Sequence, residues 1–371
     1  MVYADNAATT KLDNEAFEAM RPYLLDMYGN ASQPYSFSRS VRKALKQARE
    51  TIASCINADP EEIYFTSGGT ESDNWAIKGT MLMPGDKREL ITSQIEHHAI
   101  LHSAKFVEQM GFQVQYLPVD SVGQISPKTL EACISSKTKL VSVMLSNNEV
   151  GTIEPIKELA TIAHNNGALF HTDAVQAIGH LNIDVKLLDV DLLSASAHKF
   201  NGPKGIGFLY IRHGVEIIPF NDGGSQEFGQ RAGTENIAAI VGMATALKNN
   251  IEVLEASTLH LQKLERTILN RLNEAGIDYR RNGSDIHLSG NMSLSFKGFE
   301  GEMLLHRLDL KGICVSTGSA CDSKNTQVSH VLKAMAIDSE YAIGTIRVSL
   351  SKANTLDEAL KIADSIISIV Q

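Results

Sequence analysis

The chain has 371 residues, of which 43% are hydrophobic and 21% are charged, and this is the composition of an ordinary globular protein. Its formal net charge is −9 and it contains no long run of Lys or Arg, which argues against direct nucleic-acid binding and against an anionic-membrane surface. The N-terminal stretch does not resemble a signal peptide, and no apolar run reaches the length of a membrane span. We therefore expect a cytoplasmic protein.

Two helices are predicted ahead of the first long strand. Residues 13–29 open with Asp13 or Asn14 as an N-cap and close at Gly29, which is a common C-terminal signal. Residues 38–57 carry apolar side chains on one helical face, and this face includes Cys55. We therefore expect Cys55 to pack in the core.

Between residues 62 and 211, short apolar segments alternate with helical patterns. Several segments are apolar nearly throughout, as strands buried in a mainly parallel sheet are. Strand–helix–strand repetition predicts an α/β sheet with helices on both faces. The expected strands are 62–67, 89–94, 113–119, 139–146, 168–174, 191–197 and 205–211, and the clearest helices between them are 70–82 and 156–167.

The pattern changes after residue 235. A long helical stretch, 236–276, is predicted to bend or break near Asn249 and Asn250. The segments after it are a strand at 291–298, a helix at 300–312, strands at 313–318 and 345–351, and a helix at 355–370 that begins with a capping box. We expect a large α/β domain over residues 14–250 and a smaller α+β domain formed by residues 1–13 and 251–371.

The segment FTSGGTESDN, residues 65–74, places two glycines and Thr70 between a strand and a helix. A helix N-terminus offers free N–H groups and a positive dipole end, which suits a phosphate. The pattern is neither a P-loop nor G-x-G-x-x-G, so it does not specify a nucleotide. Taken alone, a plain turn with a capped helix explains it equally well.

Asp173 and Lys199 each follow a predicted buried strand, so we expect both at the carboxyl edge of the sheet, where open α/β folds bind ligands. A lysine partly removed from water has a lowered pKa and becomes a usable nucleophile. Ser196 and His198 could add donors for an anion. The alternatives are that Asp173 caps the next helix and that Lys199 extends from the sheet edge into solvent.

A phosphate cradle, a carboxylate and an amine are together what pyridoxal phosphate requires. His97 or His98, just after a strand, could stack over its ring, although either could be an ordinary histidine at a helix start. Cys321 follows a run of small residues suited to a mobile loop, and it is either a reactive thiol or an incidental one. The four cysteines contain no C-x-x-C pair, so we expect neither a metal site nor a disulfide framework.

Motifs along almost the whole chain resemble one family, the cysteine desulfurases of the NifS/IscS type (group I), which are class V aminotransferase-like enzymes that use pyridoxal 5'-phosphate. The motifs, in order, are YADNAATT, SGGTESDN, EHHAI, SNNEVGTIEPI, HTDAVQAIG, SASAHKFNGPKGIGFLYIR, RAGTEN, STGSACDS and TIRVSL. The resemblance implies the aspartate-aminotransferase-like fold (fold type I). It also implies that a mobile loop at about residues 316–330 of the small domain carries Cys321.

The resemblance also implies a role for each matching residue. Lys199 would bind the cofactor covalently, His97 would stack on its ring and move protons, and Cys321 would accept sulfur. Arg347 and Asn148 would bind the substrate, with the Arg347 guanidinium on the substrate carboxylate. The cofactor would be held by Lys199, Gly69, Thr70, Asn148, Asp173, Gln176, Ser196 and His198, and by Thr234, which would reach the phosphate of the partner subunit.

The implied activity converts L-cysteine to L-alanine, leaves a persulfide on Cys321 and transfers that sulfur to an acceptor protein. An iron–sulfur scaffold and a tRNA-thiolation enzyme are the acceptors considered, and a homodimer is implied. A selenocysteine lyase, or another lyase or transaminase of the same fold, is an alternative. A non-catalytic scaffold for a sulfur-carrier protein is another, although Lys199, Asp173 and Cys321 are all present.

Overall fold

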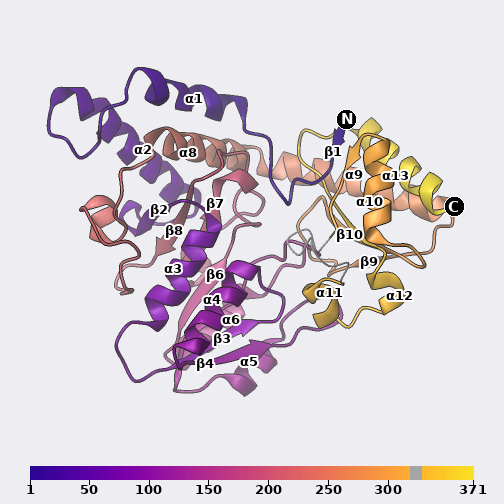
Figure 1. The fold of residues 1–371 in the computed structure, drawn as a ribbon, viewed down its shortest axis with the longest axis horizontal. Helices are drawn as coiled ribbons and strands as arrows, with labels where there is room; N and C mark the ends of the chain where they lie inside the picture. Colours follow the sequence, from indigo (N-terminus) through magenta and orange to yellow (C-terminus); the bar gives the residue numbers. More distant parts are fainter. Residues whose placement is uncertain (318–327) are drawn as a thin grey trace.

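The computed structural model describes residues 1–317 and 328–371, and its largest element is a seven-stranded mixed sheet (Figure 1). The strand order is β2-β8-β7-β6-β5-β3-β4. Only β8 runs antiparallel to its neighbours, and all other pairs are parallel. The strands are β2 (Ile63–Thr66), β3 (Glu89–Ser93), β4 (Gln113–Leu117), β5 (Thr138–Ser142), β6 (Leu169–Asp173), β7 (Leu192–Ser196) and β8 (Gly207–Ile211). The predicted mainly parallel mixed sheet is confirmed.

Helices cover both faces of this sheet because successive side chains of each strand point to opposite sides. Leu192 of β7 packs in a cluster with residues of α3 (Gly69–Met81) and α4 (His98–Gln109). Its neighbour Leu193 packs in the other cluster, with residues of α2 (Arg39–Cys55), α6 (Ile156–Asn165) and α8 (Ile237–Glu252). The shorter α5 (Pro127–Cys133) and α7 (Val185–Leu188) complete this part of the chain.

The C-terminal part of the chain has its own hydrophobic core. Its antiparallel sheet has the order β12-β10-β9, with β9 (Tyr279–Asn282), β10 (Asn291–Phe296) and β12 (Thr345–Ser349). Around it are α9 (Leu254–Glu274), α10 (Gly301–Leu310), α11 (His330–Ala334), α12 (Ser339–Ala342) and α13 (Leu356–Val370). The N-terminal strand β1 (Val2–Tyr3) pairs in parallel with β11 (Ile313–Cys314) in this part of the molecule. The predicted domain boundaries stay a prediction.

Two local predictions were wrong, the end of the first helix and the length of one strand. Helix α1 (Asn14–Leu25) begins at Asp13 as predicted but ends before Gly29. A Cβ at Gly29 would lie 2.9 Å from Ser38 Oγ. Glycine is therefore needed here because the chain passes close to Ser38, and not because it caps the helix. Within residues 313–317 of the strand expected at 313–318, only Ile313 and Cys314 form a strand, β11, which pairs with the two residues of β1.

The long C-terminal helical stretch breaks at Val253, three residues beyond the predicted position. Asn250 stays helical because its buried amide donates to the carbonyls of Phe200 and Ala246.

Within the described ranges, no single helix is long and apolar enough to cross a membrane, and α8 and α9 meet that test only as a pair bent by 70°. Cys55 is partly buried against the main core, and burial raises its pKa to about 11.

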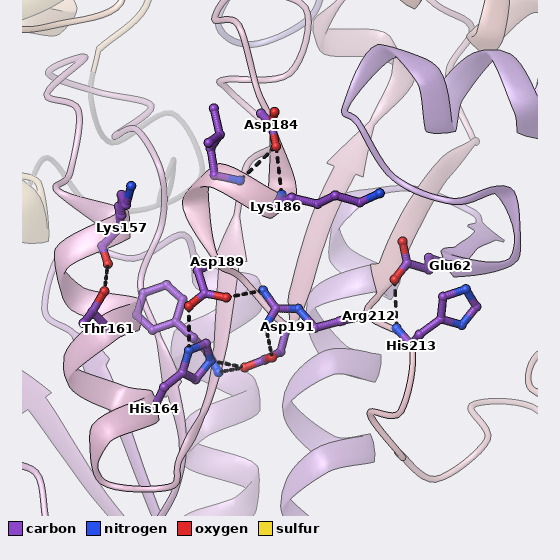
Figure 2. A network of polar contacts seen from close by, with 12 residues as sticks. Glu62, Lys157, Thr161, His164, Asp184, Lys186, Asp189, Asp191, Arg212 and His213 are labelled. Carbon is purple, nitrogen blue, oxygen red and sulfur yellow. Dashed lines mark hydrogen bonds and ion pairs between the residues drawn. The ribbon is translucent and has the colours of Figure 1, made fainter.

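A polar network ties together the edge of the main sheet where β7 begins and β8 ends (Figure 2). His164 bonds Asp191 through Nε2 at 2.8 Å and Asp189 through Nδ1 at 3.1 Å. Arg212 donates to Asp189 at 2.7 Å. Asp191 also accepts the backbone N–H of Phe170, so the network fixes β6 against β7 at the amino ends of the parallel strands. This edge is opposite to the one where ligands bind in open sheets.

A buried ion pair fixes α2 and β2 to the segment that precedes Arg231. The Arg49 guanidinium donates to both carboxylate oxygens of Glu227, at 2.8 and 2.7 Å, and also to the carbonyl of Ile63. Glu227 accepts a third hydrogen bond from the backbone N–H of Phe65 at 2.8 Å. Both side chains are almost fully buried, with 10% and 3% exposed.

We predict that Glu227→Ala lowers the free energy of unfolding by about 3 kcal/mol, because it leaves the buried guanidinium of Arg49 without its counter-charge. Urea titration followed by circular dichroism measures the change. The control is Lys46→Ala, which removes the exposed ion pair to Glu50 and should stay within about 0.5 kcal/mol of the unsubstituted protein. An effect of Glu227→Ala as small as the control would contradict the prediction.

Candidate active site

A cavity of about 290 Å³ opens where the parallel strands β6 and β7 end and helices α3 and α4 begin. Open α/β sheets commonly have a ligand-binding crevice at this place, outside the carboxyl ends of their strands. The cavity brings together all the predicted site residues except Thr234 and Cys321, namely Gly69, Thr70, His97, Asn148, Asp173, Gln176, Ser196, His198, Lys199 and Arg347. Thr234 is exposed and outside this lining, and Cys321 is outside the residues that the structure describes.

The amine of Lys199 lies against the N-terminal segment of the chain. Lys199 ends the single 3-10 turn (Ala197–Lys199) that follows β7, and its Nζ donates to the carbonyl oxygens of Ala7 and Ala8 at 2.6 and 2.8 Å. The Gln176 amide donates to the same Ala7 carbonyl at 3.0 Å. The sequence analysis did not assign Ala7 and Ala8 to the site. They lie in the YADNAATT motif, and this motif was the sequence feature that could have indicated their role.

Asp173 ends strand β6 and faces the cavity with a buried carboxylate. Its Oδ1 accepts the backbone N–H of Val175 at 2.9 Å. Burial raises the pKa of Asp173 to about 6, while the Val175 hydrogen bond and the charge of Lys199 oppose this rise. A buried carboxylate in this position suits a cationic or N–H group of a ligand.

His97 is the N-cap residue of α4 and lines the cavity, whereas His98 does not. The Nδ1 atom of His97 accepts the backbone N–H of Ala99 at 3.2 Å, which places the proton of the neutral ring on Nε2. Burial, with smaller contributions from the charge of Lys199 and from the neighbouring histidines, lowers the pKa of His97 to about 4. A neutral ring can lie flat over an aromatic ligand without the desolvation cost of a charge.

The start of α3 forms a cradle in which glycine is required. Gly68 has a φ of 146°, in the region that side-chain-bearing residues rarely adopt. A Cβ at Gly69 would lie 2.5 Å from Val175 Cγ2, and one at Gly207 would lie 2.7 Å from the Cα of Gly68. Side chains at these positions would force the backbone apart. With glycine there, the backbone N–H groups at the start of α3 can come close to a ligand.

Polar groups surround this cradle. Thr70, Ser196 and His198 line both the main cavity and an adjoining hollow of about 340 Å³, to which Lys204 also contributes. Burial lowers the pKa of His198 to about 4, with smaller contributions from Lys199 and Lys204. Together with the positive end of the α3 dipole, these donors favour an anion such as phosphate.

Arg347 reaches the cavity from strand β12 in the C-terminal part of the chain. Its Nη1 donates to the backbone carbonyl of Asn148 at 2.9 Å, and its Nη2 donates to Asp5 at 2.8 Å. Its buried Nε has no hydrogen-bond partner among residues 1–317 and 328–371. A guanidinium that lines the cavity and is held in place by two acceptors is well suited to a substrate carboxylate.

The comparisons with known proteins agree with this geometry. The family model described as "Aminotransferase class-V" matches residues 2–362. The chain is 47% identical over 371 residues to "Cysteine desulfurase IscS" of Methanosarcina thermophila, covering 100% of this chain and 92% of that relative. It is 42% identical over 376 residues to "Cysteine desulfurase" of Nostoc sp., covering 99% and 93%.

Two solved structures are similar over nearly their whole length. A "NIFS-LIKE PROTEIN" has a TM-score of 0.94 and 39% identity, with 99% of this chain and 98% of that chain covered. "SspA in complex with cysteine" has a TM-score of 0.85 and 35% identity, with 96% and 100% covered. The chain belongs to the class-V aminotransferase family, and within it to the cysteine desulfurases of the NifS/IscS type.

Enzymes of this family depend on pyridoxal phosphate, and the residues present fit that cofactor. The cavity offers an amine at Lys199, a buried carboxylate at Asp173 and a glycine cradle at the start of α3 that a Cβ would fill. These are the groups needed for the aldehyde, the ring nitrogen and the phosphate.

We predict that Gly69→Ala raises the dissociation constant for pyridoxal phosphate about tenfold or more, because overpacking of this kind costs about 1–3 kcal/mol. Fluorescence titration of the apoprotein measures the constant. Adding Val175→Ala removes the atom that the new Cβ would meet, so the double variant should recover most of the affinity, with Val175→Ala alone as the matched control. Equal affinity of Gly69→Ala and the unsubstituted protein would contradict the proposed cradle.

Proposed function

We propose that the chain is a pyridoxal-phosphate-dependent cysteine desulfurase that converts L-cysteine to L-alanine and retains the sulfur as a persulfide on Cys321. One observation carries the proposal: the amine of Lys199, the carboxylate of Asp173 and the guanidinium of Arg347 meet in one cavity. The identity of 47% to cysteine desulfurases over the full length supports the same reaction. The sulfur then passes to an acceptor protein.

The side chains of the cavity would hold the cofactor from several sides. Lys199 would bind its aldehyde carbon, Asp173 would pair with its ring nitrogen and Gln176 would contact its ring hydroxyl. Thr70, Ser196, His198 and the N–H groups of α3 would bind its phosphate, and His97 would lie over its ring. The bound cofactor supplies an electron-accepting ring that makes the bonds at the substrate Cα easier to break.

Arg347 would bind the carboxylate of L-cysteine through its guanidinium, which Asp5 and the Asn148 carbonyl hold in place. This contact fixes the substrate Cα near Lys199, whose Nζ would take the Cα proton and later return a proton to the product. The two carbonyl oxygens that accept hydrogen bonds from Lys199 hold Nζ at the wall of the cavity.

The sulfur acceptor is Cys321, which follows Ser316 by five residues. The backbone of Ser316 pairs with that of Arg347 through two hydrogen bonds of 2.7 and 3.1 Å, so the chain that leads to Cys321 starts beside the substrate-binding residue. In the reaction, the Cβ–S bond of the substrate breaks and an S–S bond to the Cys321 thiolate forms. The carbon part takes up a proton and leaves as alanine.

A homodimer in which Thr234 contacts the phosphate of the partner subunit is also proposed, and the exposure of Thr234 supports it. The acceptor is an iron–sulfur scaffold or a tRNA-thiolation enzyme, and the name IscS carried by the relatives favours the first. The cytoplasmic location stays a prediction.

Alanine release from L-cysteine and from selenocysteine, measured with and without an oxo acid, distinguishes a desulfurase from a selenocysteine lyase and from a transaminase.

We predict that Cys321→Ser retains bound pyridoxal phosphate but forms no alanine from L-cysteine, because the substrate sulfur has no thiolate to receive it. The visible absorbance of the purified protein measures the cofactor, and amino-acid analysis after incubation with L-cysteine measures alanine. Cys133→Ser is the control for loss of a thiol elsewhere in the chain, and it should turn over normally. Continued alanine formation by Cys321→Ser would rule out this role.

We predict that Arg347→Lys raises the KM for L-cysteine about tenfold to a hundredfold, because a hydrogen bond to a charged group contributes about 1.5–3 kcal/mol. Lysine keeps the charge but cannot form the same set of bonds as the planar guanidinium. Steady-state kinetics measure KM, and the cofactor absorbance verifies that the site is intact. An unchanged KM would show that the substrate carboxylate binds elsewhere.

A further inference from the structure

A row of buried polar side chains crosses the main sheet beneath α3. Ser142 of β5, His171 of β6 and Ser194 of β7 are fully buried, and their side chains form a continuous chain of hydrogen bonds. Ser142 Oγ lies 2.9 Å from His171 Nδ1, and His171 Nε2 lies 3.0 Å from Ser194 Oγ. Two residues earlier on β5 and β7, Leu140 and Leu192 pack in an apolar cluster with α3. The polar row is therefore a local exception on an apolar face.

Asp73 of α3 lies over this row and is 1% exposed. It lines the cavity together with Asp173. Its Oδ1 has no hydrogen-bond partner in the described part of the chain and lies 3.9 Å from His171 Nε2. Burial lowers the pKa of His171 to about 3, so this ring is neutral and supplies no counter-charge. No lysine or arginine of residues 1–317 and 328–371 forms an ion pair with Asp73.

Two buried carboxyl groups on one cavity wall cannot both be ionised without a cation for each. Asp173 faces Lys199 and accepts the Val175 N–H, so the negative charge is stabilised there. Asp73 faces Asp173, Ser194 and, from the segment before α4, Glu96. Burial and the charge of Asp173 raise the pKa of Asp73 well above its usual range. A hydrogen bond from Ser194 lowers this pKa, and the smaller effect of Glu96 raises it. Burial also raises the pKa of Glu96 to about 8, so Glu96 is mostly neutral at neutral pH.

We propose that Asp73 is a positioning residue that stays protonated beneath the cavity, so that the Asp73–Asp173 pair carries one negative charge and Asp173 holds it. A neutral Asp73 fills the space beside Asp173 without competing for a cation. The ring nitrogen of the cofactor would then meet a single carboxylate whose charge is fixed by its surroundings. This inference rests on the proposed function only for the identity of the ring that Asp173 meets.

Infrared spectroscopy of the apoprotein tests the protonation directly. At neutral pH, the difference spectrum between the unsubstituted protein and Asp73→Asn should contain the carbonyl stretch of one protonated carboxylic acid. Glu96→Gln is the matched control, since it removes a different buried acid and should leave the Asp73 band in place. If the difference spectrum shows only the bands of an ionised carboxylate, the proposal is wrong.

Stability gives a second measurement on the apoprotein. Because the folded state keeps a proton on Asp73 that the unfolded state releases, the stability due to this group is highest at acid pH and falls as pH rises above about 4, the usual range of Asp. In the unsubstituted protein, the free energy of unfolding should fall above about pH 4 with the slope that one proton gives. Asp73→Asn should lack this part of the slope. Equal pH dependence in the two proteins would contradict the proposal, whether or not cysteine is turned over.

The pH titration of cofactor absorbance tests the positioning role in the holoenzyme. Asp73→Asn should titrate with the same midpoint as the unsubstituted protein, because a neutral amide replaces a neutral acid. Asp173→Asn should shift that midpoint, because it removes the charge. A shift in Asp73→Asn as large as that in Asp173→Asn would place the charge on Asp73 and overturn the inference. Loss of cofactor binding in the unsubstituted protein would refute the proposed function instead, and would leave the infrared result valid.

Discussion

The segment from Asp5 to Thr9 holds the site together, because it bonds four side chains that would bind cofactor or substrate. The carbonyls of Ala7 and Ala8 accept the amine of Lys199, and the Ala7 carbonyl also accepts Gln176. Asp5 accepts the guanidinium of Arg347, and Thr9 bonds His198. The pairing of β1 with β11 fixes the start of this segment in the C-terminal part of the molecule. The segment therefore positions charged groups from two separate hydrophobic cores around one cavity.

Charge is distributed unevenly around this cavity because the acids that line it, Asp73 and Asp173, and the nearby Glu96 are buried. Burial raises the pKa of Asp73, Glu96 and Asp173, and only Asp173 faces a lysine amine. Burial also keeps His97 and His171 neutral. With Asp73 neutral, the charged groups among the described residues that line the cavity are the carboxylate of Asp173, the amine of Lys199 and the guanidinium of Arg347, which Asp5 pairs with from outside the lining. A small number of fixed charges in a region of low dielectric can orient a zwitterionic amino acid strongly.

A second polar chain connects the two cores behind Lys199. Lys352, just after β12, donates to Asn250 Oδ1 at 3.1 Å, and Asn250 donates to the carbonyl of Phe200 at 2.7 Å. His180 bonds the carbonyl of Lys199 itself at 2.9 Å. Strand β12 also carries Arg347. The strand that carries Arg347 and the backbone of Lys199 are therefore connected through the same junction.

The strands of the main sheet, the family and most of the cavity residues could be predicted from the sequence, whereas β1 and β9 could not. Asp173 and Lys199 could be placed together because parallel strands end at the same edge of a sheet, and short segments that are apolar nearly throughout mark such buried strands. Only the tertiary structure decided that α1 ends at Leu25, that Ala7 and Ala8 accept the lysine amine, and that Asp73 lies buried beside Asp173. The reason is that local patterns record which face of an element is apolar, whereas long-range contacts and the desolvation that shifts a pKa depend on where the rest of the chain packs.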